Sequence, residues 1–442
     1  MTSRRLPSTG LRPRSTDCPE AMGGREEPVA GVDLPRRFVL PADQRERVPV
    51  GVVWELTSAC DLGCKHCGSR AGRKLRSELS TAECLDLVDQ LAALGVRDVG
   101  LIGGETYLRR DWVTIIRAIR QAGMDCSLQT GGRGMTDARL EEAVAAGLQG
   151  MGVSIDGLAP THDYLRGVEG SFAAAEDLLV RLKRFDVTVG VNTQINRLSM
   201  PELPVLLDLL AANSVRNWQL ALTVAMGNAA DRPDLILQPY ELLDLFPMLS
   251  NLHTKAKAMG MVLQPSNNIG YFGPYEAQLR YVNDMPVHWA GCAAGDTVLG
   301  IEADGTIKGC PGFSRDYVGG NVRDEPLKEI WARPDALAFV RRSTVDDLWG
   351  FCRSCYYAET CMSGCTWTSH SLLGRPGNNP LCHYRAIDFD RRGLRERVVP
   401  VQRAPGERFD YGRFDLIVEP KPPALPERPA AVGDRRLRDR LF

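Results

Sequence analysis

Thirteen cysteines stand out in this chain of 442 residues, and three of them lie close together at Cys60, Cys64 and Cys67. Such short gaps let three thiolates converge on one small metal group without the cost of closing a long loop. An iron–sulfur cube normally takes four thiolates, so three would leave one iron open to another ligand. The alternative is a zinc site of three cysteines and a histidine, but His66, directly before Cys67, is badly placed to bind the same ion.

A second group of cysteines lies in the C-terminal part. Its seven members are Cys292, Cys310, Cys352, Cys355, Cys361, Cys365 and Cys382. Large apolar runs are few there, so metal binding is expected to contribute much of this region's stability. Paired zinc sites are the alternative, although an odd number of cysteines with gaps of five and three residues fits two zinc knuckles poorly. The remaining cysteines, Cys18, Cys84 and Cys126, are assigned no role.

The elements that must position the first group form a regular alternation. Strand-like runs occur at 51–57, 97–102, 125–130, 150–155, 187–195 and 216–224, with helix-like periodicity between them. Ser80 and Glu83 form a capping-box pattern at the start of the first helix. The alternation predicts about six β/α units, hence a parallel sheet with helices outside. Six units favour an open or partial barrel over the closed eight-stranded form.

Polar residues follow several of these strands, at the edge where chemistry gathers in parallel α/β folds. The second strand ends in Gly103-Gly104-Glu105, where glycines allow close backbone approach and the carboxylate can accept from an ammonium group. Thr130 ends the third strand, Ser154 and Asp156 the fourth (with Arg166 beyond), and Asn192 lies in the fifth. Each has an ordinary structural explanation alone, as a turn, a cap or a salt bridge. No such explanation predicts all of them on one rim beside three thiols.

Together these residues resemble the signature of radical S-adenosylmethionine (SAM) enzymes. The resemblance implies a 4Fe–4S cluster on Cys60, Cys64 and Cys67 whose open iron chelates SAM and whose electron releases a 5′-deoxyadenosyl radical. It also implies SAM contacts by His66, Gly103, Gly104, Glu105, Thr130, Ser154, Asp156, Arg166 and Asn192. Two departures are Thr106, where the family usually has proline, and Gln129-Thr130-Gly131, where it often has Thr-Asn-Gly.

The seven C-terminal cysteines resemble the SPASM domain, an iron–sulfur appendix of radical SAM enzymes. The resemblance implies auxiliary cluster I on Cys292, Cys310 and Cys365, and auxiliary cluster II on Cys352, Cys355, Cys361 and Cys382, hence three 4Fe–4S clusters in all. Many relatives have a further cysteine just before the first of the seven, which is missing here. Cluster I is therefore expected to have an open iron or to use Asp284 or His288.

These patterns divide the chain into four parts. Residues 1–48 are predicted to be a disordered extension, 49–262 the radical SAM partial barrel, 263–390 a bridging region with the SPASM domain, and 391–442 a Pro/Arg-rich tail. A net charge of −1 gives no reason to expect a nucleic acid or membrane partner. The chain has no apolar run near ~18–20 residues and no secretory signal, so we expect a cytoplasmic protein.

The resemblance implies a radical SAM oxidoreductase, and the largest group of SPASM proteins modifies ribosomally made peptides. A peptide maturase is therefore the main hypothesis. The alternatives are a dehydrogenase acting on a small molecule or carbohydrate, and a non-catalytic iron–sulfur electron carrier or scaffold. Pro311 follows Cys310 where sulfatase maturases have an aspartate, which argues against that activity.

The implied partners follow from the same resemblance. The N-terminal extension is too short and polar for a leader-binding domain, so a peptide substrate predicts either a separate leader-binding protein or direct binding by the SPASM region. A reductant such as flavodoxin or ferredoxin is also implied. Aromatic residues gather before Cys292 and are expected to line a substrate channel or to form core between the two domains; they are Tyr271, Phe272, Tyr275, Tyr281 and Trp289.

Overall fold

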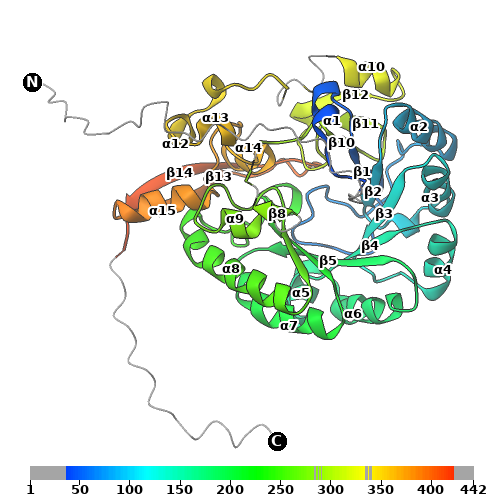
Figure 1. Cartoon of the computed structure of the whole chain (residues 1–442), viewed down its shortest axis with the longest axis horizontal. Helices are drawn as coiled ribbons and strands as arrows, with labels where there is room; N and C mark the ends of the chain where they lie inside the picture. The colour runs from blue at the N-terminus through cyan, green and yellow to red at the C-terminus, as the bar shows by residue number, and fades with distance from the viewer. Residues whose placement is uncertain are drawn as a thin grey trace, which may run out of the picture.

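The computed structural model describes residues 36–422 except 283, 284, 287, 290, 334–336 and 338–340. Its centre is a curved parallel sheet with helices on the outside (Figure 1). The parallel strands of this barrel are β1 (Gly51–Thr57), β2 (Asp98–Gly103), β3 (Asp125–Thr130), β4 (Gly150–Ser154), β5 (Thr188–Ile195), β6 (Asn217–Leu222) and β7 (Val262–Pro265). Consecutive strands pair in chain order, which confirms the predicted partial barrel and adds β7 to the six expected units.

The helices between these strands cover the outer face of the sheet (Figure 1). They are α2 (Thr81–Ala93), α3 (Trp112–Gln121), α4 (Asp137–Ala145), α5 (Ala159–Arg166), α6 (Ser171–Leu182), α7 (Leu203–Ala212) and α8 (Leu242–Ala258). The predicted capping box starts α2, because the Ser80 hydroxyl accepts from the backbone N–H of Glu83 and the Glu83 carboxylate accepts from that of Ser80. These helices carry the apolar stripe that the periodicity predicted.

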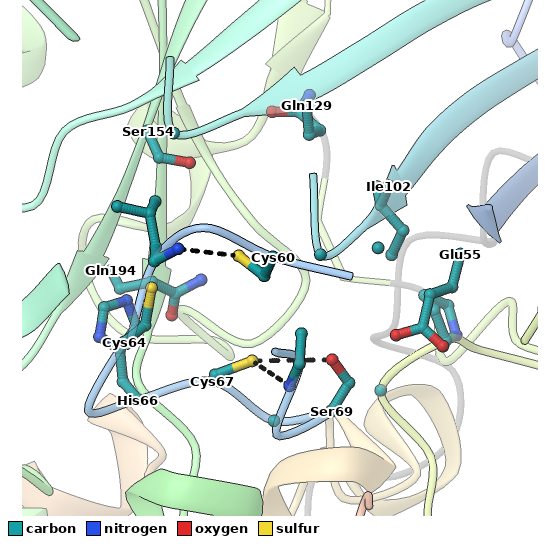
Figure 2. A pocket seen from close by; sticks show the side chains of 18 of the residues that line it. Glu55, Cys60, Cys64, His66, Cys67, Ser69, Ile102, Gln129, Ser154 and Gln194 are labelled. Carbon is teal, nitrogen blue, oxygen red and sulfur yellow. Dashed lines mark hydrogen bonds between the residues drawn. The ribbon is translucent and has the colours of Figure 1, made fainter. Parts of the chain in front are cut away.

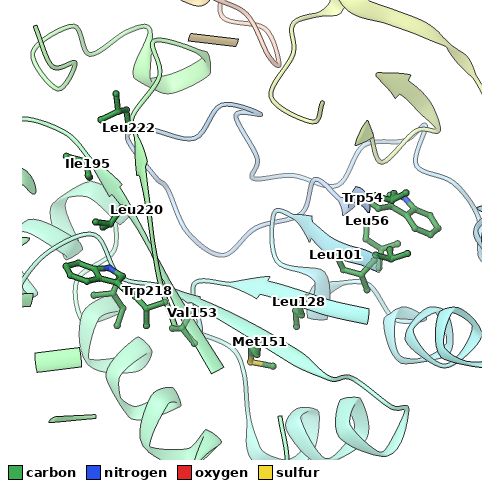
Figure 3. Close-up of a cluster of buried hydrophobic side chains, with 14 of the residues drawn as sticks. Trp54, Leu56, Leu101, Leu128, Met151, Val153, Ile195, Trp218, Leu220 and Leu222 are labelled. Atoms are coloured by element: carbon green, nitrogen blue, oxygen red, sulfur yellow. The ribbon is translucent and has the colours of Figure 1, made fainter. Parts of the chain in front are cut away.

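The main core lies between the sheet and these helices, and Figure 3 shows part of it. Leu128, Met151 and Val153 from β3 and β4 are almost fully buried, as is Trp218 from β6. The Trp218 indole N–H donates to the Thr193 hydroxyl at 2.9 Å, which satisfies the one polar atom that its burial removes from water. This packing gives the strand ends a rigid base.

The cysteine-rich region extends the same sheet. Strand β10 (Val298–Ile301) pairs parallel to β1, and β11 (Thr306–Lys308) and β12 (Val318–Asn321) continue antiparallel. Its short elements are α9 (Glu276–Leu279), β8 (Tyr281–Val282), β9 (Met285–Pro286), α10 (Leu327–Ala332), α12 (Gly350–Arg353), α13 (Ala358–Cys361), α14 (Thr366–Leu373) and α15 (His383–Arg391). Cys310 lies on the loop that follows β11. Because β11 pairs with β10 and β10 pairs with β1, this loop begins close to β1.

The prediction of a tail over 391–442 is wrong for its first part. Residues 394–420 form an antiparallel hairpin of β13 (Leu394–Gln402) and β14 (Arg413–Pro420), and it packs beside α15 (Figure 1). A buried ion pair between Arg385 and Glu396 at 2.6 Å holds it, and the Gln238 side chain both donates to the backbone carbonyl of Val398 and accepts from its N–H. The composition was misleading because Arg395 and Arg397 pair with a glutamate on the opposite strand.

The prediction of disorder over 1–48 is also wrong for residues 36–48. Helix α1 (Pro41–Glu46) lies there, and its Asp43 pairs with Arg97 at 2.6 Å. That contact joins residues far apart in the chain, so local composition could not indicate it. Residues 1–35, with Cys18, and residues 423–442 lie outside the described part. Among the described residues, no helix is both long and apolar enough to cross a membrane.

Candidate active site

The three cysteines of the first group lie on a loop that leaves β1 and is held at both ends. The backbone N–H of Cys60 donates to Gly72 at 2.9 Å, and that of Gly63 donates to Arg166 at 2.9 Å. The buried Glu78 carboxylate accepts hydrogen bonds from the side chain of Thr57 and the backbone of Ser58, both at 3.0 Å. Sequence reasoning missed Glu78, since no motif marks it. The loop is thus shaped by the surrounding chain.

The three thiols point into one shared space (Figure 2). Burial, with smaller contributions from Glu105 and the other two thiols, raises the pKa of Cys60 to about 12. Burial likewise raises the pKa of Cys64 to about 11, although Arg166 opposes the shift. Partly buried thiols that point into one space gain when a cationic metal group takes the place of their protons. The donor set therefore fits an iron–sulfur cluster.

A cavity of about 360 Å³ opens beside these thiols. Most of the predicted SAM contacts line it: His66, Gly103, Gly104, Glu105, Thr130, Ser154, Arg166 and Asn192. The structure thus brings the ends of β2, β3, β4 and β5 to the cysteine loop, as the strand-end argument predicted. Asp156 differs, because it does not line the cavity.

Gly103, the last residue of β2, and Gly104, which follows it, allow the strand end to pack against the end of β1 and the cysteine loop. A Cβ on Gly104 would lie 1.9 Å from the carbonyl oxygen of Ala59, and one on Gly103 would lie 2.2 Å from that of Thr57. The close approach that these glycines allow is therefore to the protein's own backbone. No side chain fits at either position without moving the cysteine loop.

Glu105 is held in a fixed orientation beside these glycines. Its carboxylate accepts hydrogen bonds from the Thr130 hydroxyl and the Gly131 backbone, both at 2.6 Å. Burial raises its pKa to about 7, and these two donors oppose the shift. A buried carboxylate with no paired cation is suited to accept from a ligand's ammonium group.

Asp156 acts behind the cavity wall. Its carboxylate lies 2.7 Å from the Arg166 guanidinium and 3.1 Å from His66 Nε2, and it accepts from the backbone of Gln194 at 2.8 Å. Burial opposes its charged form, but Arg166 and His66 hold the pKa of Asp156 below its usual range. Asp156 therefore positions two cavity residues, which corrects its prediction as a direct cofactor contact.

Gln129 also lines the cavity, and sequence reasoning gave it no role. Gln129 lies on the same side of the view as Ser154 in Figure 2, and the side-chain amide of Asn192 donates to the side-chain oxygen Oε1 of Gln129. A Cβ on Gly152 of the neighbouring strand would lie 2.1 Å from Gln129, so that glycine makes room for the amide. The position of Gln129 at the end of β3 could have marked it as a cavity residue. Its hydrogen bond with Asn192 could not be predicted, because it depends on how the strands pair.

The seven C-terminal cysteines fall into two groups in space. Cys352, Cys355, Cys361 and Cys382 line one small cavity. Burial, with a smaller contribution from Cys365, raises the pKa of Cys292 and of Cys310 to about 12, so both thiols lie within electrostatic range of Cys365. The assignment of these cysteines to two clusters stays a prediction. Of the two proposed extra ligands, Asp284 lies outside the described residues, and His288 is exposed with Nδ1 2.9 Å from the carbonyl oxygen of Trp289.

Two of the aromatic residues before Cys292 form core between the two cysteine groups. The Tyr271 hydroxyl accepts from the backbone N–H of Cys365 at 2.9 Å, and the Trp289 indole donates to the carbonyl of Cys361 at 3.0 Å. The two rings pack edge to face with centroids 5.3 Å apart. Both are buried away from the SAM-side cavity, in a small cluster with Cys361 and Cys365 that is separate from the main core. They therefore do not line that cavity, and the core they form lies within the cysteine-rich region and not between the two domains.

The far side of the main cavity is built from C-terminal segments. Cys310, Trp367 and Phe409 line it together with Glu55 and Glu302. Phe409 belongs to the turn of the C-terminal hairpin, which was expected to be part of a tail. One cavity is therefore shared by the β1 loop, the cysteine-rich region and the hairpin.

The comparisons with known proteins agree with this geometry. The radical SAM superfamily model matches residues 54–204, and the SPASM model, an iron–sulfur cluster-binding domain, matches residues 292–356. The chain therefore contains a radical SAM domain followed by a SPASM domain, which implies SAM and a 4Fe–4S cluster and suggests auxiliary iron–sulfur clusters.

Similar proteins include both heme-forming enzymes and peptide cyclases. An AdoMet-dependent heme synthase of Nitratidesulfovibrio vulgaris is 26% identical over 357 residues, covering 76% of this chain and 92% of the relative. A PqqA peptide cyclase of Methylocella silvestris is 28% identical over 345 residues, covering 76% and 87%. The same fold occurs in Streptococcus suis SuiB bound to its precursor peptide SuiA (TM-score 0.58, 16% identity, 77% of each chain). It also occurs in AdoMet-bound anSMEcpe (TM-score 0.61, 14% identity, 77% and 95%).

Proposed function

We propose that this protein is a radical SAM oxidoreductase that modifies a ribosomally made peptide. The observation that carries the proposal is the shared cavity, which brings the three cysteines of the β1 loop and Cys310 of the cysteine-rich region to one enclosed space. A substrate placed there lies between the SAM side and the SPASM side. The relatives named PqqA peptide cyclase and the SuiA-bound fold neighbour support a peptide.

Each part of the cavity has a role in this proposal. Cys60, Cys64 and Cys67 would hold the first 4Fe–4S cluster, and SAM bound there would supply a 5′-deoxyadenosyl radical able to remove hydrogen from the substrate. Glu105 accepts from the cofactor's amino group, and Arg166 binds its carboxylate. His66 and the polar groups of Thr130, Ser154 and Asn192 orient the rest of SAM. The glycines after β2 keep the loop and this binding surface in contact.

The proposal includes two auxiliary 4Fe–4S clusters. Cys292, Cys310 and Cys365 would hold cluster I, and Cys352, Cys355, Cys361 and Cys382 would hold cluster II. The two groups of cysteines found in space support this assignment. A flavodoxin or ferredoxin would supply electrons, and a separate leader-binding protein would present the peptide. Cytoplasmic location is part of the same proposal, because the clusters need a reducing compartment.

A second candidate substrate is a tetrapyrrole, since several relatives are named heme synthase or Fe-coproporphyrin III synthase. One feature of the cavity argues against it: the far wall presents the carboxylates of Glu55 and Glu302. Propionate groups of a tetrapyrrole would meet like charge there. A dehydrogenase of small molecules would also form 5′-deoxyadenosine but would leave peptides unchanged, whereas a non-catalytic electron carrier would form none.

The test is SAM cleavage by anaerobically reconstituted protein with dithionite, followed by mass spectrometry of synthetic peptides encoded beside its gene. We expect 5′-deoxyadenosine to form, and we expect a Cys60→Ala variant to form none. A peptide substrate would change in mass only with SAM and reductant present. Fully iron-loaded protein that forms no 5′-deoxyadenosine would contradict the enzyme proposal and favour the electron carrier.

A further inference from the structure

Two buried glutamates, Glu55 and Glu302, lie side by side in the wall of the cavity, near the ends of β1 and β10. Trp54 of β1 pairs with Ile301 of β10, so the next residues, Glu55 and Glu302, leave the two strands in register. Their exposed fractions are 2% and 4%, and both line the cavity. Figure 2 shows Glu55 across the cavity from Ser154.

A cation from behind the wall neutralises each carboxylate. Lys308 of β11 is fully buried and lies 2.7 Å from Glu302, and its ammonium group also donates to the carbonyl of Phe313 at 2.5 Å. The guanidinium of Arg408 donates to Glu55. Neither Lys308 nor Arg408 lines the cavity, so of these four side chains only the two carboxylates face it. The two carboxylates and the two cations together carry no net charge.

The hairpin turn that supplies Arg408 is fixed against the cysteine loop. The backbone N–H of Phe409 donates to Gly68 at 3.2 Å, and Arg70 pairs with Asp410 at 2.9 Å. The Lys308 ammonium lies 3.6 Å above the Phe409 ring. The wall is therefore preorganised, with both cations held by contacts that do not involve a ligand.

We infer that Glu55 and Glu302 anchor the substrate by accepting hydrogen bonds from neutral N–H groups, such as the amides of a peptide. This inference rests on the proposed function, and it specifies which chemical group of the substrate binds at the wall formed by Glu55 and Glu302. A carboxylate already paired with a cation keeps free lone pairs for donors. Because the cluster is neutral, an added substrate carboxylate would meet two like charges, and an added ammonium would leave an uncompensated charge.

Val224, Met226 and Trp367 complete the wall around the two acceptors. Apolar surroundings strengthen hydrogen bonds to a carboxylate, because water does not compete for the same lone pairs. These apolar side chains also favour a substrate whose reacting part is apolar and which has few hydrogen-bond donors. A peptide segment with an apolar side chain has this character, and a polycarboxylate does not.

The experiment uses two small probes of equal size and opposite chemistry, propanamide and propionate, each deuterated on carbon. Reconstituted holoenzyme cleaves SAM with dithionite in the presence of one probe. If the probe lies in the cavity, its C–D bond breaks and the deuterium forms a C–D bond at C5′ of 5′-deoxyadenosine. The carbon radical left on the probe takes one electron from dithionite and a proton from water. The readout is the deuterated fraction of 5′-deoxyadenosine, so it does not depend on the total amount cleaved.

We expect the deuterated fraction from propanamide to exceed that from propionate about tenfold. Glu55→Gln and Glu302→Gln replace one acceptor oxygen by an amide N–H group, so each should cut this preference several-fold. Glu141→Gln on the exposed face of α4 should leave it unchanged. Equal fractions from the two probes, more from propionate, no transfer from propanamide, or the same preference in all variants would overturn the inference. Failure to form any 5′-deoxyadenosine would instead overturn the proposed function.

Discussion

The two cysteine regions of this molecule are built in different ways. The first group lies on a loop fixed by the barrel: Glu78 accepts from its start, and Arg166 contacts both its backbone and Cys64. Among its described residues, the second region has short helices and four non-glycine residues with left-handed backbone, Tyr271, Phe272, Met362 and Ser363, whereas the first loop has one, Arg70. Such backbone costs free energy and persists only where the surroundings hold it. The difference indicates that the first site is shaped before metal binds, whereas the second depends on its metal.

Removing iron should separate the two cysteine regions most clearly, because only the C-terminal region is expected to lose its structure. We expect backbone amides between residues 352 and 382 to exchange hydrogen rapidly in iron-free protein, because the metal supplies much of the stability there. Amides of β2 and β3 should stay protected, since their packing does not involve the clusters. Hydrogen exchange with mass spectrometry on loaded and iron-free protein measures both. Equal loss of protection in the two regions would mean that the barrel depends on metal as well.

Glu78→Ala should have the next largest effect. It leaves the buried donors of Thr57 and Ser58 without an acceptor, at a cost on the order of 3 kcal/mol in the free energy of unfolding. Denaturant unfolding of the protein is the measurement, with Glu141→Ala as an exposed control expected to change stability by less than about 0.5 kcal/mol. If both variants lose the same stability, the barrel does not hold the cysteine loop as described.

Glu105→Gln should weaken SAM binding by about 1–3 kcal/mol, the range for a charge-assisted hydrogen bond. The amide also turns a donor toward Thr130 or Gly131, which already donate to this position. Calorimetric titration of the loaded protein with SAM measures the change. Unchanged affinity would show that Glu105 supports the loop and does not contact the cofactor.

Tyr271→Phe should have the smallest effect, about 1–2 kcal/mol in the stability of the loaded protein, because the hydroxyl accepts from Cys365 and donates to the carbonyl of Asn267 at 2.6 Å, and both hydrogen bonds are lost while the ring remains. Tyr356→Phe is a matched control nearby, since Tyr356 is 74% exposed. Unfolding of the two variants in parallel separates the contact from a general effect of the region. A larger loss in the control would contradict the role given to Tyr271.

Much of the site could be predicted because its signals are local. The cysteine spacings and the residues at the strand ends lie within short segments, and parallel strands bring their ends to one edge. Glu55, Glu302 and Arg408 could not be predicted, because their roles arise from pairing between β1, β10 and a hairpin far along the chain. The hairpin itself was missed for the same reason: its arginines look solvated until the opposite strand supplies Glu419.

The most direct test of the account is the content of iron, zinc and acid-labile sulfide per chain in protein purified and reconstituted without oxygen. The account predicts about twelve irons per chain, which is about four for each of three clusters, with an equal amount of sulfide and no zinc. About four irons together with zinc would contradict it. The radical SAM site would then remain, but the C-terminal cysteines would form a zinc-stabilised domain without auxiliary clusters.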